Sequence, residues 1–204
     1  MTKLIKSSIF SFLLTAVILG CSGSSGDSIA ATPTLTEYQF SATIDLVMAT
    51  PPFPVALGDT VTGTFSYDPT VKDTAVSPSA GAYVQKVPAT VQVIIGSVTL
   101  NADLNNWLGY VIGVKDNDSS VSPTRDILSW YVNDTLLAAS YGLDYIQLGF
   151  SLTDLTASVF NNAAMPDDIN LRDYSNGYLF ISGSKNNAGL WNLRSKVNSI
   201  TRVQ

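Results

Sequence analysis

Two short acidic clusters contain the residues of this chain best suited to chemistry. Asp116-Asn117-Asp118 is one cluster, and Asp167-Asp168 together with Asp173 is the other. Calcium takes about six to eight oxygen ligands, which Asp- and Asn-rich loops supply, so Asp116 and Asp118 are candidate calcium ligands. Neither cluster has the spacing of an EF-hand or an RTX repeat, and solvated turn residues are the favoured interpretation of both.

Paired carboxylates also allow one kind of catalysis without histidine, the hydrolysis of glycosidic bonds, which needs two carboxyl groups about 5 to 9 Å apart. The sequence contains no histidine, which excludes His-based general acid–base catalysis, Ser-His triads and the usual zinc and copper sites. It also has no Walker-type loop, Gly-x-Ser-x-Gly elbow or dinucleotide fingerprint. We therefore expect a non-enzymatic protein, with a carboxylate-based carbohydrate-active enzyme as the alternative.

Aromatic residues offer a second chemistry, the stacking of sugar rings on exposed ring faces. Trp107 lies in the polar stretch Asn105-Asn106-Trp107 and is the tryptophan least suited to a core, so it is the candidate stacking residue. Trp130 and Tyr131 are adjacent in an expected strand and face opposite sides, so at most one of them belongs to the core. Core packing is favoured for most of the other members of the set: Trp191, Tyr110, Tyr141, Tyr145, Tyr174 and Tyr178.

Strands must position these residues, because the clearest periodicity in the chain has a repeat of two. In the stretch Gly58–Asp68 one side of an extended chain carries Val61, Gly63, Phe65 and Tyr67, and the other carries Thr60, Thr62, Thr64 and Ser66. The β-branched threonines are typical of a solvated sheet face, and Asp68-Pro69 ends the strand. A single strand is not stable alone, so other segments must pair with it.

Similar alternation predicts strands along the rest of the chain. The expected strands cover Glu37–Met48, Gly81–Val84, Thr90–Leu100 as a hairpin that turns near Gly96-Ser97, Tyr110–Lys115, Ile127–Asn133, Tyr145–Leu152, Tyr178–Ser182 and Trp191–Val203. Asp154–Asn162 is expected to form a short helix. Nine or ten strands separated by turn signals predict an all-β fold, an antiparallel β-sandwich, with a lipocalin-like β-barrel as the alternative. Uneven strand lengths and long loops after Asp68 and Val159 favour the sandwich.

Composition limits the class of protein and of partner. Hydrophobic residues make up 46% of the 204 residues and charged residues only 13%, which suits an exported β-protein with a buried core. Without a leader that holds Lys3 and Lys6, nine basic residues face 16 acidic ones, a net charge of −7. An acidic surface repels phosphates, so no nucleic-acid partner is expected.

The N-terminal residues predict export and a lipid anchor. Residues 1–20 hold two lysines followed by an apolar run too short to span a membrane comfortably, which is the pattern of a signal peptide. The ending Ile18-Leu19-Gly20-Cys21 resembles the bacterial lipobox, which implies cleavage before Cys21 and lipidation of this single cysteine. Residues 21–36 are rich in Gly and Ser and predict a flexible tether, so residues 37–204 are expected to be one β-sandwich domain. Ser22 takes the place of the Asp that retains lipoproteins at the inner membrane, which favours the outer membrane.

The order of features in Glu37–Gly183 resembles the secreted β-domains of PEP-CTERM-type bacterial proteins. The matching residues are Gly58-Asp59, Gly63, Phe65, Tyr67-Asp68, Gly81, Tyr83, Val93–Val98, Met165-Pro166 and Leu179–Gly183. The chain departs from that group after Gly183, where it has no Pro-Glu-Pro, no final apolar span and no basic tail. The lipid on Cys21 would replace that sorting signal, and the resemblance implies no catalytic residue.

We therefore expect a lipid-anchored protein of the bacterial cell envelope, on its periplasmic or surface face. Its expected role is that of a non-enzymatic binding or adhesion module of the envelope matrix. Its expected partners are the membrane, through Cys21, and a glycan or an envelope protein. A carbohydrate-binding protein or a carboxylate-based enzyme is the alternative, and no cofactor is expected apart from calcium at Asp116 and Asp118.

Overall fold

The computed structural model describes residues 34–102, 104, 110–133, 135–185 and 190–203, which all belong to one structural unit. Nearly all regular structure in these residues is β, which confirms the predicted all-β antiparallel class. The strands are β1 Thr36–Met48, β2 Thr60–Tyr67, β3 Ala80–Gln85, β4 Val91–Ile95, β5 Val98–Asn101, β6 Tyr110–Asp118, β7 Arg125–Asn133, β8 Tyr145–Asp154, β9 Asn176–Ser184 and β10 Leu190–Arg202. A short α-helix, α1 (Thr135–Ser140), and a 3-10 turn, η1 (Leu171–Asp173), complete the described elements.

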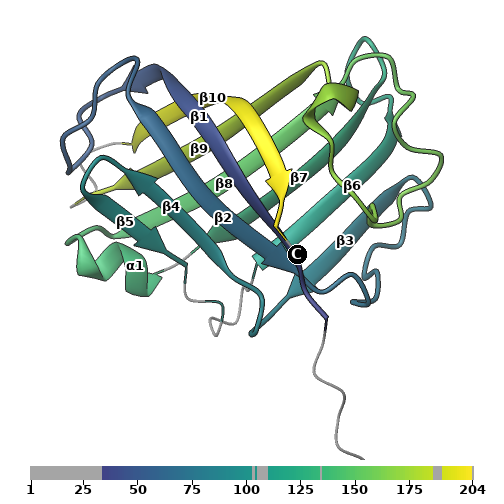
Figure 1. The fold of residues 1–204 in the computed structure, drawn as a ribbon, viewed down its shortest axis with the longest axis horizontal. Coiled ribbons are helices and arrows are strands. Elements are labelled where there is room, and N and C mark those ends of the chain that lie inside the picture. The colour runs from purple at the N-terminus through teal and green to yellow at the C-terminus, as the bar shows by residue number, and fades with distance from the viewer. Residues whose placement is uncertain (1–33, 103, 105–109, 134, 186–189, 204) are drawn as a thin grey trace, which may run out of the picture. The chain divides into compact units, whose positions relative to one another are not determined.

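The ten strands form one antiparallel sheet in the order β3-β6-β7-β8-β9-β10-β1-β2-β4-β5. The first and last strands pair with each other, and Figure 1 shows the purple β1 beside the yellow β10. Strands β6 to β10 follow one another as a meander, whereas β3 crosses to the far edge beside β6. The predicted hairpin turn at Gly96-Ser97 is confirmed, because Ile95 pairs with Val98.

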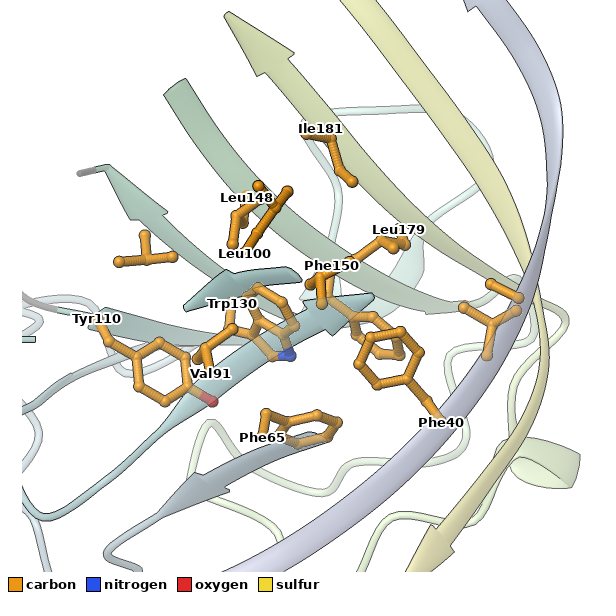
Figure 2. Close-up of a cluster of buried hydrophobic side chains, with 14 of the residues drawn as sticks. Phe40, Phe65, Val91, Leu100, Tyr110, Trp130, Leu148, Phe150, Leu179 and Ile181 are labelled. Carbon is orange, nitrogen blue, oxygen red and sulfur yellow. The ribbon is translucent and has the colours of Figure 1, made fainter. Parts of the chain in front are cut away.

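The sheet curls so that its two halves face each other across a shared core. Four strands separate β2 from β7, yet the ring of Phe65 lies 5.8 Å from that of Trp130 and 5.6 Å from that of Phe150. Trp130 and Phe150 stack at 5.5 Å, as Figure 2 shows. Register shifts between β1 and β10 contribute to the curl, because a bulge bends the strand that carries it.

Residues 155–175, here called the covering segment, pack against this core. Met165, Pro166 and Ile169 line the same small apolar space as Phe65 and Trp130. The hydroxyls of three strand tyrosines hold the segment: Tyr67 donates to the Pro166 carbonyl at 3.0 Å, Tyr38 to Asp168 Oδ1 at 3.0 Å, and Tyr83 to the Ala163 carbonyl at 2.8 Å.

The helix expected over Asp154–Asn162 is wrong. β8 continues to Asp154, and turns and bends follow it. The Asp154 carboxylate accepts hydrogen bonds from the backbone N–H groups of Thr156 at 3.0 Å and Ser158 at 2.9 Å. Such side-chain bonds to nearby backbone compete with helix formation. The described α-helix lies instead at Thr135–Ser140, where six residues are too few to show a helical period.

Candidate binding surface

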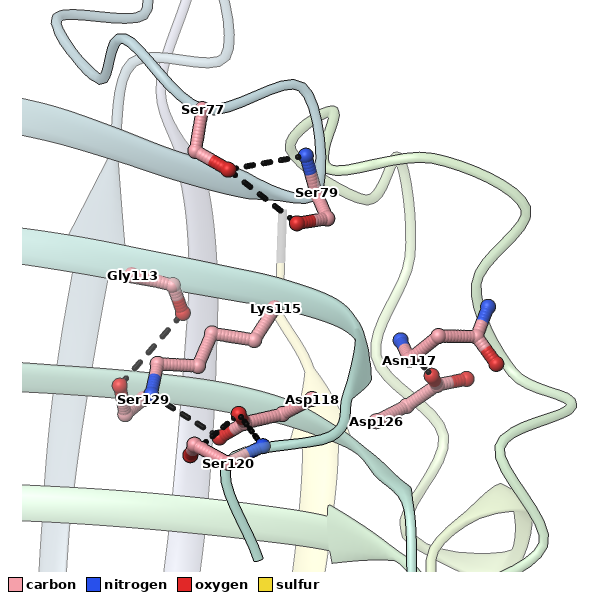
Figure 3. A network of polar contacts seen from close by, with 9 residues as sticks. All are labelled: Ser77, Ser79, Gly113, Lys115, Asn117, Asp118, Ser120, Asp126 and Ser129. Atoms are coloured by element: carbon pink, nitrogen blue, oxygen red, sulfur yellow. Dashed lines mark hydrogen bonds and ion pairs between the residues drawn. The ribbon is translucent and has the colours of Figure 1, made fainter.

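The acidic cluster Asp116-Asn117-Asp118 lies at the end of β6, where its members bind their own neighbours. Asp118 accepts hydrogen bonds from the Ser120 hydroxyl at 2.6 Å and from Lys115 Nζ at 2.9 Å, as Figure 3 shows. The hydrogen bond from Ser120, followed by that from Lys115, lowers the pKa of Asp118 to about 2. This arrangement is typical of a structural turn.

The second cluster gathers around a different hollow. Asp167, Asp168 and Asp173 all line a space of about 290 Å³ on the covering segment, and Asp168 also accepts the hydrogen bond from Tyr38. In the part of the chain that the structure describes, no three acidic or cysteine residues are grouped as a metal site requires. Calcium binding at Asp116 and Asp118 stays a prediction.

Two of the predicted site residues, Cys21 and Trp107, lie outside the described residues. The prediction for the neighbouring pair is confirmed: Trp130 is 3% exposed in the core, and Tyr131 on the opposite face is 44% exposed. Core packing also holds for Trp191, Tyr110 and Tyr174, which are buried, whereas Tyr141, Tyr145 and Tyr178 are half-buried.

Two buried carboxylates that the sequence interpretation missed hold the covering segment. Asp126 and Asp154 are paired across β7 and β8 and are 0% and 2% exposed. Asp126 accepts from the backbone N–H of Phe160 at 2.8 Å and from that of Asn117 at 2.9 Å. Burial alone would raise the pKa of Asp154, but hydrogen bonds from Ser158 and Thr156 outweigh it and lower the pKa to about 2. The sequence signal for this role is the Asp-x-Thr-x-Ser spacing after β8.

An uncharged hollow of about 440 Å³ lies on the outer face of β10, β1, β2 and β4. We call it the outer hollow, and its lining residues are Gln39, Phe40, Ser41, Thr62, Gly63, Thr64, Gln92, Ile94, Ser199 and Thr201. Its volume falls within the range of about 300–1,000 Å³ that is typical of ligand sites. None of its lining residues carries a formal charge.

Strand register brings the polar residues of the outer hollow together. One cross-strand row runs through Ser199, Ser41, Thr62 and Ile94, and the next runs through Thr201, Gln39, Thr64 and Gln92. The hydroxyls of Ser41 and Ser199 lie 2.8 Å apart, and Gln92 Nε2 donates to Asn101 Oδ1 at 2.7 Å. Hydroxyl and amide groups both donate and accept hydrogen bonds, so this surface suits a ligand that is rich in hydroxyl groups.

Comparisons with protein-family models, with curated proteins and with solved structures found no match to this chain. No helix within the described residues is long and apolar enough to cross a membrane.

Proposed function

We propose that this protein is a lipid-anchored, non-enzymatic binding module of the bacterial cell envelope whose ligand is a neutral, hydroxyl-rich polymer such as a glycan. The observation that carries the proposal is the uncharged lining of the outer hollow. The chain is acidic overall, yet none of the residues that β10, β1, β2 and β4 contribute to this hollow is charged. The lipid on Cys21 and the outer-membrane location belong to the proposal and rest on residues 18–22.

Charge supports a neutral ligand over an ionic one. An ion that binds in a site without an opposite charge loses hydration that the site does not replace. Ser41, Thr62 and Gln92 offer only neutral hydrogen-bond donors and acceptors. The hydroxyl groups of a sugar can both donate to and accept from such groups.

The carboxyl groups of Asp118 and Asp154 do not have the pKa that hydrolysis of a glycosidic bond needs. A glycoside hydrolase needs a carboxyl group whose pKa is raised so that it can donate a proton. The pKa of Asp118 and that of Asp154 are both lowered to about 2, which is the opposite direction. Asp116 and Asp118 lie at the end of β6, while Asp167, Asp168 and Asp173 line a hollow of the covering segment.

A glycan array tests the proposal. The full chain, purified in mild detergent, is applied to an array that carries neutral and acidic oligosaccharides, with and without calcium. We expect binding to neutral members, and we expect Thr62→Lys to abolish it, because the lysine side chain fills the outer hollow and adds a charge.

The matched control is Thr60→Lys. Thr60 is also exposed on the outer face of β2, but it lies outside the outer hollow. Binding that survives Thr62→Lys, or that both substitutions remove equally, would count against the outer hollow. Binding only to acidic glycans would count against a neutral ligand.

A further inference from the structure

Gly149 lies in the middle of β8, on the outer face of the sheet, at a position where the backbone does not require glycine. Its φ is not positive, and a Cβ atom added there would meet described atoms only at ordinary contact distances, 3.8 Å to the Trp130 carbonyl oxygen and 3.9 Å to Phe180 Cβ. A glycine inside a strand weakens the strand and often marks a place where a ligand approaches the backbone closely. The fold alone therefore does not explain why position 149 is a glycine.

The cross-strand neighbours of Gly149 are two exposed aromatic rings. Register pairs Gly149 with Tyr131 of β7 on one side and with Phe180 of β9 on the other. Tyr131 is 44% exposed and Phe180 is 41% exposed, and both belong to the small set of exposed large hydrophobic residues in the described chain. Burying such rings against a ligand is favourable, whereas leaving them in water is not.

The spacing of the three strands leaves room for one ring between the two aromatic side chains. Strands lie about 4.8 Å apart, so the Cα atoms of Tyr131 and Phe180 are separated by about 10 Å. A flat ring held between two others needs about 7 to 8 Å, twice the contact distance of carbon atoms. Side chains stand roughly perpendicular to a sheet, so the two rings form walls and Gly149 forms a bare floor. The Phe180 wall also packs along its own strand, because its ring centre lies 6.1 Å from that of Tyr178.

On β7, β8 and β9 the rows on both sides of this floor are uncharged and polar. One row contains Asn133, Gln147 and Ser182, and the other contains Ser129, Ser151 and Tyr178. Gln147 Nε2 donates to Asn133 Oδ1 at 2.8 Å, which shows that these amides lie within reach of one another.

The nearest cation in the same row is already paired. Arg194 lies opposite Phe180 on β10, and its Nε and Nη2 atoms each donate to an Asp45 carboxylate oxygen at 3.0 Å. The Arg194 guanidinium also lies 4.9 Å from the centre of the Tyr178 ring. It is therefore engaged with neighbours in the sheet, and Lys196, which pairs with Tyr178, lies on β10 beyond the three strands that carry the aromatic pair and Gly149. The residues next to Gly149 on β7, β8 and β9 are uncharged, which favours a neutral ligand.

We propose that Tyr131, Gly149 and Phe180 form a stacking slot that holds one ring of a neutral sugar. The inference extends the proposed function by adding a second site and naming the part of the ligand that it recognises. The C–H faces of the sugar ring contact the two aromatic walls, and its hydroxyl groups reach the polar rows on either side. A lipid surface fits less well, because on β7, β8 and β9 the rows beside the slot carry polar residues where membrane-binding faces carry apolar ones.

The test is a calorimetric titration of the full chain with the neutral oligosaccharides that bind best on the array. Tyr131→Ala and Phe180→Ala each remove one wall, and Gly149→Val fills the floor. We expect each variant to lower the affinity by about tenfold or more, which is the scale of a lost stacking contact. Tyr145→Ala is the matched control, because Tyr145 also faces outward on β8 but lies four residues from Gly149, and it should leave the affinity unchanged.

The thermal stability of Gly149→Val separates a ligand site from a structural glycine. Valine favours strands, so the variant should unfold at the wild-type temperature or above it while its binding is lost. A lower unfolding temperature would overturn the inference, since Gly149 would then serve the fold. Unchanged affinity in all three slot variants would also overturn it.

Parallel titration of Thr62→Lys distinguishes the two proposals. Sugar binding that is lost only in Thr62→Lys overturns the slot and leaves the proposed function standing. Sugar binding that is lost only in the slot variants supports the slot and excludes the outer hollow as a sugar-binding site. If the wild-type chain binds no neutral sugar, both the outer hollow and the stacking slot are overturned. Both are also overturned if the wild-type chain binds only vesicles of phosphatidylethanolamine and phosphatidylglycerol, and if this binding requires Tyr131 and Phe180.

Discussion

Gly63 and Gly149 both lie inside strands, but their surroundings give them different roles. A Cβ atom at Gly63 would overlap the Gln92 carbonyl oxygen and would come within 2.6 Å of Phe40 Cζ. Gly63 faces Phe40 across the β1–β2 pair, so the missing side chain gives the Phe40 ring its place in the core. Gly149 has no such neighbour, so we attribute the glycine at this position to the proposed ligand and not to packing.

Gly63→Ala should therefore destabilise the protein by about 1–3 kcal/mol or more, the usual cost of overpacking. Gly149→Ala should be neutral or slightly stabilising, because its Cβ meets nothing closer than 3.8 Å among the described atoms. Urea unfolding of both variants measures the difference. Equal losses would mean that the surroundings of the two glycines do not differ as described.

Asp154 is a single residue whose contribution to the free energy of unfolding depends on pH. Its pKa in the folded protein is about 2, below the ordinary value of 3.8, so its stabilising effect is complete above pH 3.8 and is lost as the pH falls toward 2. Asp154→Asn keeps an acceptor oxygen but loses the charge. We expect it to lower the free energy of unfolding at pH 7 by about 1–3 kcal/mol. Between about pH 2 and pH 3.8 the free energy of unfolding of this variant should also depend less on pH than that of the wild type. Denaturant unfolding at several pH values measures this dependence, and the same dependence in both proteins would show that other groups cause it.

At the scale of elements, alternation was sufficient to predict β2 because side-chain direction in a strand depends only on position. Val61 and Phe65 are 0% and 1% exposed, whereas Thr60 and Thr62 are exposed, as predicted. Pairing is different, because the neighbour of β1 is β10, about 150 residues later, and no local pattern indicates this. The role of Asp154 was missed for another reason, because its partners Thr156 and Ser158 are local and the Asp-x-Thr-x-Ser spacing was not recognised as a turn.

Phe65→Ala tests the register of β2. The ring contacts Trp130, Phe150 and Tyr38, so its loss should cost about 3–5 kcal/mol. Thr64→Ala should cost far less, because Thr64 points to the outer face and is only half-buried. Chemical denaturation of the two variants compares them directly, and similar losses would show that the register is wrong by one residue.

At the scale of the whole molecule, both candidate sites depend on strand pairing that the sequence does not reveal. The outer hollow joins Thr62 to Ser199, and the stacking slot joins Tyr131 to Phe180. The solvated face of β2 could be predicted, and Tyr131 was one of two candidates for an exposed ring. Their neighbours could not be predicted, because residues meet in a sheet by register and not by sequence distance.

The proposed lipid on Cys21 would decide where the molecule acts. If the Ile18-Leu19-Gly20-Cys21 motif directs lipidation, radiolabelled palmitate should enter the wild-type chain in a bacterial host and should not enter Cys21→Ser. Ser22→Asp, which introduces the inner-membrane retention residue, is the informative companion and should keep the label but shift the protein to the inner membrane. Equal labelling of the wild type and Cys21→Ser would contradict the lipid anchor.

The outer face of the sheet is proposed to bind a neutral polymer through uncharged groups, and the salt dependence of glycan binding is the measurement that tests this. The full chain is titrated with a neutral oligosaccharide at ionic strengths of about 0.01 M and about 1 M, between which the Debye length falls from about 30 Å to about 3 Å. The affinity should be the same at both, because no ion pair forms. A steep loss of affinity at high salt, or no saturable binding of any neutral oligosaccharide, would contradict the claim.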